Sequence, residues 1–220
     1  MPVMIPMRIF FSKTGVVKYI SHLDTMRTLT RALKRSGLPI WHTQGFNPHP
    51  YLTFALPIAL GYESECESFD VRLVEELSPE EVVDRLGGAL APGFRALRAA
   101  APVMDPADIA WADYEIVLRG LDAAGAGERL CSFLGQKEIL VVKKTKKSQR
   151  EVDISPLLEL LDAGECGDGL LLRLRLASGN TVNINPSLFL GAFQRFSGLV
   201  PAAVSVKRTA ILNGALENFC

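Results

Sequence analysis

The sequence predicts an α+β protein made of two ferredoxin-like halves, each a split βαβ unit with an antiparallel sheet, the second elaborated by an extra helix and a hairpin. Segments rich in β-formers alternate with segments of helical periodicity, and this order recurs on both sides of a proline-containing connection at 101–106. The length of 220 residues suits two packed halves of about a hundred residues each. We therefore expect an N-terminal half over 1–104 and a C-terminal half over 105–220.

The first half is expected to open with two β-rich segments, 8–12 and 16–20, around a short turn. A helix over 22–36 follows, with Ser21 as its N-cap and Gly37 at its end. The stripe of apolar residues along this helix has the spacing of one buried face.

A second helix of this half is signalled by Ser78 as N-cap and by Pro79 at the first helical position. Strands at 69–74 and 94–100 are expected to flank it. An acidic run precedes this helix, and it is interpreted as a solvated strand edge in preference to a site for Mg²⁺ or a basic partner. Its members are Glu63, Glu65, Glu67 and Asp70.

The second half is expected to repeat the alternation with additions. The expected strands are 114–118, 139–142, 170–176, 181–184 and 204–212, of which 170–176 and 181–184 form a hairpin. Helices are expected over 128–134 and from Asn185-Pro186 onward, with an extra short helix over 155–160.

Composition limits the classes of function. The chain has 24 Lys and Arg residues and 24 Asp and Glu residues, so its net charge does not indicate nucleic-acid binding. Only local clusters of cations could indicate it. The four cysteines form no C-x-x-C pair, so we expect no iron–sulfur cluster, no metal site and no cofactor, and a reducing, cytoplasmic location. The apolar start of the chain is short and interrupted by proline, and no run reaches the roughly 20 apolar residues of a membrane span, so no membrane partner is expected.

Two clusters of cations are candidate phosphate contacts. Along the helix at 22–36, one broad arc carries Arg27, Arg31, Lys34 and Arg35. Further on, a concentrated basic stretch contains Lys143, Lys144, Lys146, Lys147 and Arg150. The alternative for the first cluster is an ordinary solvated face. The alternative for the second cluster is a contact with a protein or a role in solubility only. The second cluster also has no aromatic side chain on which a base could stack.

The segment 44–50, Gln-Gly-Phe-Asn-Pro-His-Pro, is the best candidate for a ligand pocket, because glycine and two prolines can hold its polar groups rigidly. Gln44, Asn47 and His49 are its candidate binding residues. His22, His42 and His49 are candidate acid–base residues if the fold brings them together. The alternative is a tight turn with surface histidines.

A family resemblance rests on several motifs. They are Tyr19-Ile20-Ser21-His22-Leu23-Asp24, Gln44-Gly45-Phe46-Asn47-Pro48-His49-Pro50, Leu60-Gly61-Tyr62-Glu63-Ser64 and the weaker Glu151-Val152-Asp153-Ile154 and Lys207-Arg208-Thr209. Over nearly the whole chain the sequence resembles the radical-SAM-linked protein family, a domain of unknown function. The resemblance implies a radical-SAM protein as partner, because members are often encoded beside or fused to one and frequently lie near genes of RNA processing. The family is also similar in fold to tandem ferredoxin-like RNA-binding proteins.

The cysteine triad C-x₃-C-x₂-C of radical-SAM enzymes is absent from the sequence, so any radical chemistry is expected to belong to another polypeptide. We therefore expect a non-catalytic binding or substrate-presenting partner of a radical-SAM enzyme, acting on an RNA-related substrate. A metal-independent endoribonuclease or small hydrolase that uses the histidines is the second hypothesis, and an adaptor that binds only protein is the third.

Overall fold

The computed structural model describes residues 4–144, 149–179 and 182–220. The chain is an α+β protein whose strands pair antiparallel, and the described residues include four α-helices. It divides into two compact units. Unit 1 consists of Met1–Asp108 together with Asn218–Cys220, and unit 2 consists of Ile109–Glu217. The sequence predicted one boundary, between residues 104 and 105, and did not predict that the last three residues belong to unit 1.

Unit 1 contains a sheet, two α-helices and two short 3₁₀ segments. In chain order these are β1 (Ile5–Lys13), η1 (Gly15–Tyr19), α1 (His22–Arg35), β2 (Thr53–Phe54), β3 (Glu63–Leu73), α2 (Pro79–Gly87), β4 (Phe94–Ala100) and η2 (Pro106–Asp108). β1 lies between β4 and β3, and the short β2 pairs with β3. Each of these three pairings is antiparallel.

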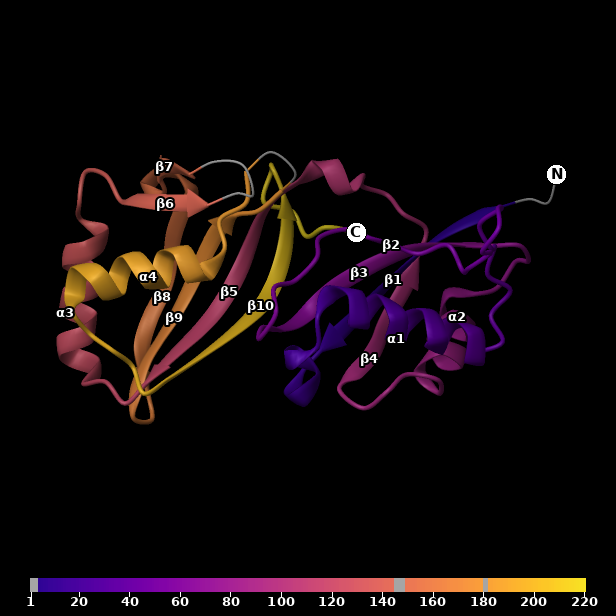
Figure 1. Ribbon diagram of the computed structural model, residues 1–220, viewed down its shortest axis with the longest axis horizontal. Helices are drawn as coiled ribbons and strands as arrows, with labels where there is room; N and C mark the ends of the chain where they lie inside the picture. Colours follow the sequence, from indigo (N-terminus) through magenta and orange to yellow (C-terminus); the bar gives the residue numbers. More distant parts are fainter. Residues whose placement is uncertain (1–3, 145–148, 180–181) are drawn as a thin grey trace. The chain divides into compact units, whose positions relative to one another are not determined.

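The core of unit 1 lies between the sheet and the helices α1 and α2 (Figure 1). Phe11 of β1 and Phe69 of β3 meet there, with ring centroids 5.5 Å apart. Leu29 and Leu33 of α1 are completely buried against them. Of the predicted apolar stripe Leu23, Met26, Leu29 and Leu33, the last two lie on the buried face of α1, whereas Leu23 is exposed and Met26 is half-buried. The charged side chains of this helix are exposed.

The local signals for both helices of unit 1 are confirmed. The Ser21 hydroxyl accepts a hydrogen bond from the amide of Asp24 (3.1 Å) and caps α1. The Ser78 hydroxyl accepts one from the amide of Glu81 (3.2 Å), and Pro79 occupies the first turn of α2. Each cap satisfies a backbone donor that has no partner inside the helix.

The prediction of a strand at 16–20 is wrong, because this segment forms the 3₁₀ helix η1. Gly15 has φ +68°, and this left-handed residue turns the chain out of the sheet directly after β1 ends. Val17 and Ile20 then pack partly buried against the core from a helical turn. Tertiary packing thus outweighs the β propensity of these residues.

The acidic run before α2 is a solvated edge only in part, because Glu65 is exposed but Glu67 is buried. These residues belong to β3, which pairs with β1 along the run and with β2 at Phe69 and Asp70. Glu67 is 2% exposed and lies near Lys13, which is 1% exposed. Burial lowers the pKa of the Lys13 ammonium group, and the charge of Glu67 acts in the opposite direction.

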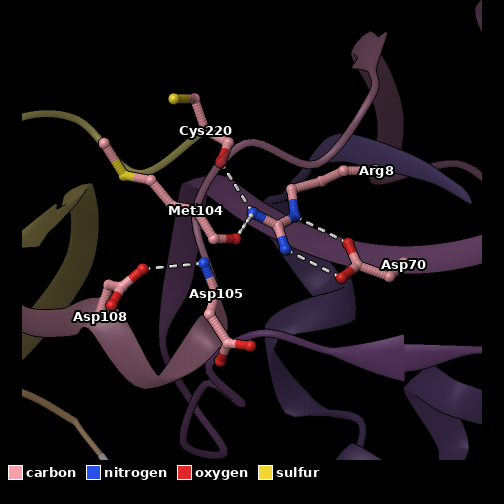
Figure 2. Close-up of polar contacts among 6 residues, drawn as sticks. All are labelled: Arg8, Asp70, Met104, Asp105, Asp108 and Cys220. Carbon is pink, nitrogen blue, oxygen red and sulfur yellow. Dashed lines mark hydrogen bonds and ion pairs between the residues drawn. The ribbon is translucent and has the colours of Figure 1, made fainter.

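A buried arginine joins distant segments of unit 1. The guanidinium of Arg8 forms a bidentate pair with the carboxylate of Asp70 (2.7 and 2.9 Å) and donates to the backbone oxygens of Met104 and Cys220, both at 2.8 Å (Figure 2). The ring of Phe219 lies 4.3 Å from it. Asp70, from the acidic run, is therefore a structural residue that holds the chain start, the connection and the last residues together.

Unit 2 contains four strands that pair antiparallel and a separate two-stranded hairpin (Figure 1). Its elements are β5 (Ile109–Arg119), α3 (Ala123–Leu134), β6 (Leu140–Lys144), β7 (Gln149–Asp153), η3 (Ser155–Leu157), β8 (Leu158–Cys166), β9 (Gly169–Ala177), α4 (Pro186–Ser197) and β10 (Ala203–Asn213). The strand order is β10-β5-β9-β8, and β6 pairs with β7. Phe133 of α3 packs against Phe189 and Phe193 of α4.

Two expectations for unit 2 need correction. The extra helix expected over 155–160 is only the 3₁₀ turn η3, because Leu158 already begins β8, which pairs with β9. The expected strand at 181–184 is reduced to an isolated bridge between Ser178 and Asn183, and residues 180 and 181 lie outside the described part of the chain. β8 and β9 form the sheet hairpin instead.

The predicted start of α4 is confirmed, since the Asn185 side chain accepts from the amide of Ser187 (2.9 Å) and Pro186 opens the helix. In the described ranges 4–144, 149–179 and 182–220, no helix is both long enough and apolar enough to cross a membrane.

Candidate functional site

Three of the predicted cations project from one exposed side of α1. Arg27, Arg31 and Lys34 follow one another at intervals of four and three residues, which places them on one stripe of the helix. All three are exposed. A rise of about 1.5 Å per residue spreads them over about 10 Å along the helix axis.

This stripe forms one wall of a groove in unit 1, and the segment after α1 forms the other wall. The groove has a volume of about 350 Å³ and is lined by Met26, Arg27, Thr30, Arg31, Lys34, His49, Pro50 and Leu52. Its size lies at the lower end of the range of about 300–1,000 Å³ that small-molecule sites occupy. The structure thus brings together two candidates that the sequence left separate, the cations of α1 and the segment 44–50.

The groove combines a cationic rim with an apolar floor. Arg27, Arg31 and Lys34 supply positive charge, while Met26 and Leu52 supply apolar surface. No aspartate or glutamate occurs from residue 25 to residue 62, so the segments that build the groove carry no acid of their own beyond the first turn of α1. An anion with an apolar part therefore matches this surface in charge and polarity.

Asp24 is the carboxylate nearest to the rim along α1. Its pKa is lowered by hydrogen bonds from Ser21 and then from Arg27, whose guanidinium lies 3.2 Å from the carboxylate. Both members of this ion pair are more than half exposed, with side chains 59% and 53% accessible. Such exposed pairs contribute little free energy, so Arg27 can exchange Asp24 for a phosphate at small cost.

Arg35, the fourth predicted cation of α1, has a different role. Its guanidinium donates to the backbone oxygen of Ala89 (2.7 Å), just beyond α2. Arg35 does not line the groove. We therefore assign it to the contact between the end of α1 and the segment after α2.

The segment 44–50 is the tip of a longer loop whose base is paired like a hairpin. His42 and Pro50 form an antiparallel bridge. The amide of Thr43 donates to the oxygen of His49 (2.9 Å), and the amide of Tyr51 donates to the oxygen of Trp41 (3.0 Å). The predicted rigidity of this segment therefore has a structural basis in its paired ends.

His49 lines the groove, and its Nδ1 lies 3.0 Å from the backbone oxygen of Asn47 and 3.1 Å from the hydroxyl of Thr43. Gln44 and Asn47, the amide candidates of the same loop, are both exposed.

The other two histidines do not line the groove. The ring of His22, at the start of α1, packs edge-on against Phe54 with centroids 4.8 Å apart. Nδ1 of His42 donates to the oxygen of Ile40 (3.0 Å). The contacts of the described residues thus assemble no pair of histidines for acid–base catalysis.

The second basic cluster belongs to the β6–β7 hairpin of unit 2. Lys143 and Lys144 end β6, Arg150 lies on β7, and Lys146 and Lys147 lie outside the described residues. The ammonium of Lys143 donates to the backbone oxygen of Asn183 (2.9 Å), so this cation has a structural partner.

A larger hollow of about 530 Å³ also lies on unit 1, near the junction of β1 and β4. Its lining is Ser12, Thr14, Glu65, Gly93, Phe94, Arg95 and Leu97. One arginine faces one glutamate there, so the lining has no net charge. Glu65 of the acidic run is the one residue of this lining that the sequence singled out, whereas the smaller groove contains four of the candidate binding residues. We therefore take the smaller cationic groove as the candidate site.

Sequence reasoning missed the floor of the groove. Met26 falls within the apolar stripe of α1, and Leu52 lies outside every motif, so neither has a local signal of function. The stretch from residue 25 to residue 62, which contains no aspartate or glutamate, was the available sequence signal for the groove, because it includes the segments that form both walls. Within the described residues, no group of three or more His, Cys, Asp or Glu side chains is placed to hold a metal ion.

The fold and the groove define an α+β protein with a candidate anion-binding site. The chain belongs to the family described as "Uncharacterized protein conserved in bacteria" (DUF2344), whose model matches residues 7–186. No curated protein matches this sequence. Among solved structures, the crystal structure of an unknown protein from Galdieria sulphuraria is similar at 16% identity over 94% of this chain and 99% of that chain, with a TM-score of 0.28.

Proposed function

We propose that this protein is a non-catalytic RNA-binding subunit that presents an RNA-related substrate to a radical-SAM enzyme. The observation that carries the RNA part is the groove that sets Arg27, Arg31 and Lys34 beside His49. Guanidinium and ammonium groups engage phosphate oxygens and release counterions, which makes such a stripe a contact for a polyanion.

The fold part of the proposal is that each unit is a ferredoxin-like split βαβ unit. The strand orders β4-β1-β3-β2 and β10-β5-β9-β8 support it, because each has the first strand of its unit in the middle and all neighbours antiparallel. The β6–β7 hairpin is then an insertion after α3. We propose a second RNA contact at Lys143 and Lys144 of β6 and Arg150 of β7, together with Lys146 and Lys147, which follow in the sequence and lie outside the described residues.

The partner part rests on the motifs at 19–24 and 44–50 that resemble the radical-SAM-linked family. The four free cysteines fit a reducing, cytoplasmic location, which we include in the proposal. An endoribonuclease is the second candidate, and the presence of His49 in the groove is the observation that favours it. No described contact specifically favours a protein-only adaptor.

The test is the salt dependence of RNA binding by the whole chain. The triple variant Arg27→Gln, Arg31→Gln, Lys34→Gln removes the rim charges without touching the buried face of α1. Each phosphate contact contributes about 0.7 to the slope of log K against log salt for a single strand, so the slope should flatten by about 2. Between about 50 and 200 mM salt, the wild type should lose roughly 20-fold more affinity than the variant.

A matched control changes the same net charge elsewhere. Arg119, Lys137 and Arg195 are exposed cations of unit 2, and their replacement by glutamine should leave the slope nearly unchanged. Equal slopes for the two triple variants would show that the groove is not the RNA contact. The nuclease would be favoured instead if the wild type cleaved the labelled RNA and His49→Ala slowed this cleavage by roughly 10²-fold while it retained binding.

A further inference from the structure

We propose that Phe46 is a stacking platform for an unpaired base, so that the groove takes single-stranded RNA in preference to a duplex. This inference rests on the proposed function, because it assigns the class of ligand at the same groove. Phe46 lies at the tip of the loop over 43–50 and has a relative accessibility of 105%. Among the described large apolar side chains it is the most exposed.

Hydrogen bonds order the loop backbone on both sides of Phe46. Hydrogen bonds pair Thr43 with His49 (2.9 Å) and Trp41 with Tyr51 (3.0 Å) at its base. Nearer the tip, Nδ1 of His49 lies 3.0 Å from the oxygen of Asn47. Because this backbone is already ordered, the loop loses less conformational entropy when Phe46 stacks on a ligand, which favours binding.

The position of Phe46 favours a nucleobase over an apolar protein partner. A single exposed apolar side chain is ordinary, but this one stands three residues from His49, which lines the cationic groove. At most about 11 Å separates their Cα atoms, since three residues span no more than about 3.6 Å each. A ligand whose phosphates lie along Arg27, Arg31 and Lys34 can therefore place a neighbouring base at Phe46.

The neighbours of Phe46 support the same class of ligand. Gln44 and Asn47 are exposed, and each carboxamide offers both donors and an acceptor for the edge of a base. The chain neighbours of Phe46 are Gly45 and Asn47, so no large apolar side chain adjoins it in the sequence.

The preference for a single strand follows from the geometry of stacking. Inside a duplex both faces of each base are covered by neighbouring bases, whereas an unpaired base can turn a face to an aromatic side chain. The loop tip projects a flat ring and no cation. It is therefore suited to a splayed base and not to a helical phosphate backbone.

The test compares Phe46→Ala with the wild type on a labelled unstructured RNA, on the same RNA annealed to its complement, and on a version with abasic sites. We expect Phe46→Ala to weaken binding to the unstructured RNA by roughly 5- to 150-fold, the range for loss of one base–aromatic stack. Binding to the duplex and to the abasic RNA should change by less than about 2-fold on the same reasoning. The slope against salt should stay unchanged, because no phosphate contact is removed.

Two controls complete the experiment. Phe46→Trp should retain the affinity, since it keeps an aromatic face. Tyr19→Ala removes another exposed aromatic side chain of unit 1, one that does not line the groove, and should have no effect.

The outcomes separate the two proposals. Equal affinity of Phe46→Ala and wild type, combined with a flattened slope in the rim triple variant, would overturn the stacking proposal and leave the RNA function standing. Loss of affinity that is equal for unstructured, duplex and abasic RNA would also overturn it, because it would indicate a disturbed loop. Absence of RNA binding by the wild type at low salt would overturn both and favour a protein partner.

Discussion

Replacement of Arg8 by methionine is expected to destabilise unit 1 by about 3–5 kcal/mol, the range for removing one partner of a buried ion pair. The Arg8 side chain is 1% exposed and that of Asp70 is 22% exposed. Methionine fills much of the same volume but leaves the Asp70 carboxylate and the oxygens of Met104 and Cys220 without this donor (Figure 2). Because Asp70 keeps some access to water, we expect the lower half of the range.

The measurement is urea unfolding of the whole chain followed by tryptophan fluorescence. The two tryptophans are Trp41 and Trp111, and they lie in different units. In a Trp111→Phe background the signal reports Trp41 and hence unit 1. With a slope of about 2 kcal/mol per molar urea, the lower half of the range corresponds to a midpoint that falls by about 1.5–2 M.

Arg85→Met is the matched control in the same unit. Arg85 pairs with Glu81 on α2, and the two side chains are 40% and 42% exposed. Exposed pairs of this kind contribute less than about 1 kcal/mol, so the midpoint should scarcely move. If Arg8→Met were no more destabilising than Arg85→Met, the Arg8 cluster would not stabilise unit 1 and the reasoning would fail. The double variant Arg8→Met, Asp70→Leu should be more stable than the sum of the two single changes predicts, since it leaves no unpaired charge.

Two further predictions concern local geometry. The carboxylate of Asp153 accepts hydrogen bonds from backbone amides, that of Ser155 first, and these bonds lower its pKa. The carboxylate therefore stabilises the folded chain at pH values above the ordinary aspartate pKa of about 3.9. This contribution to stability is lost as the pH falls through the lowered pKa. Asp153→Asn should therefore be less stable than the wild type near neutral pH, and the gap in urea midpoint should narrow as pH falls below the ordinary pKa of an aspartate; a gap that stays constant with pH would contradict this. Gly93 has φ +92°, and a Cβ there would lie 2.7 Å from the side chain of Val17, so Gly93→Ala should lower stability by more than about 1 kcal/mol. Gly87→Ala, where nothing lies within 4 Å, should cause no loss, and equal midpoints for the two variants would refute the steric argument.

The sequence by itself determined the features that local interactions control. Ser21, Ser78 and Asn185 mark the starts of α1, α2 and α4, because each cap bonds to an amide only two or three residues away. The β4 strand was likewise predicted with its bounds, Phe94–Ala100. In these segments the local preference and the tertiary environment agree.

Tertiary structure decided the features that depend on residues far apart in the chain. The segment 16–20 has β-forming residues but turns into η1, because Gly15 directs it away from the sheet. β8 has no alternating apolar pattern, and only its pairing with β9 makes it a strand. Strand pairing is non-local, so the segment itself carries little information about it.

The candidate site shows the same division. The sequence indicated the cations of α1 and the rigidity of 44–50, since periodicity and proline content are local properties. Only the folded chain places His49 beside Arg27 and Arg31, sends Arg35 to Ala89 and exposes Phe46. The partners of Arg8 include Cys220, 212 residues away, and a contact of that separation exists only when packing has already closed the chain between them.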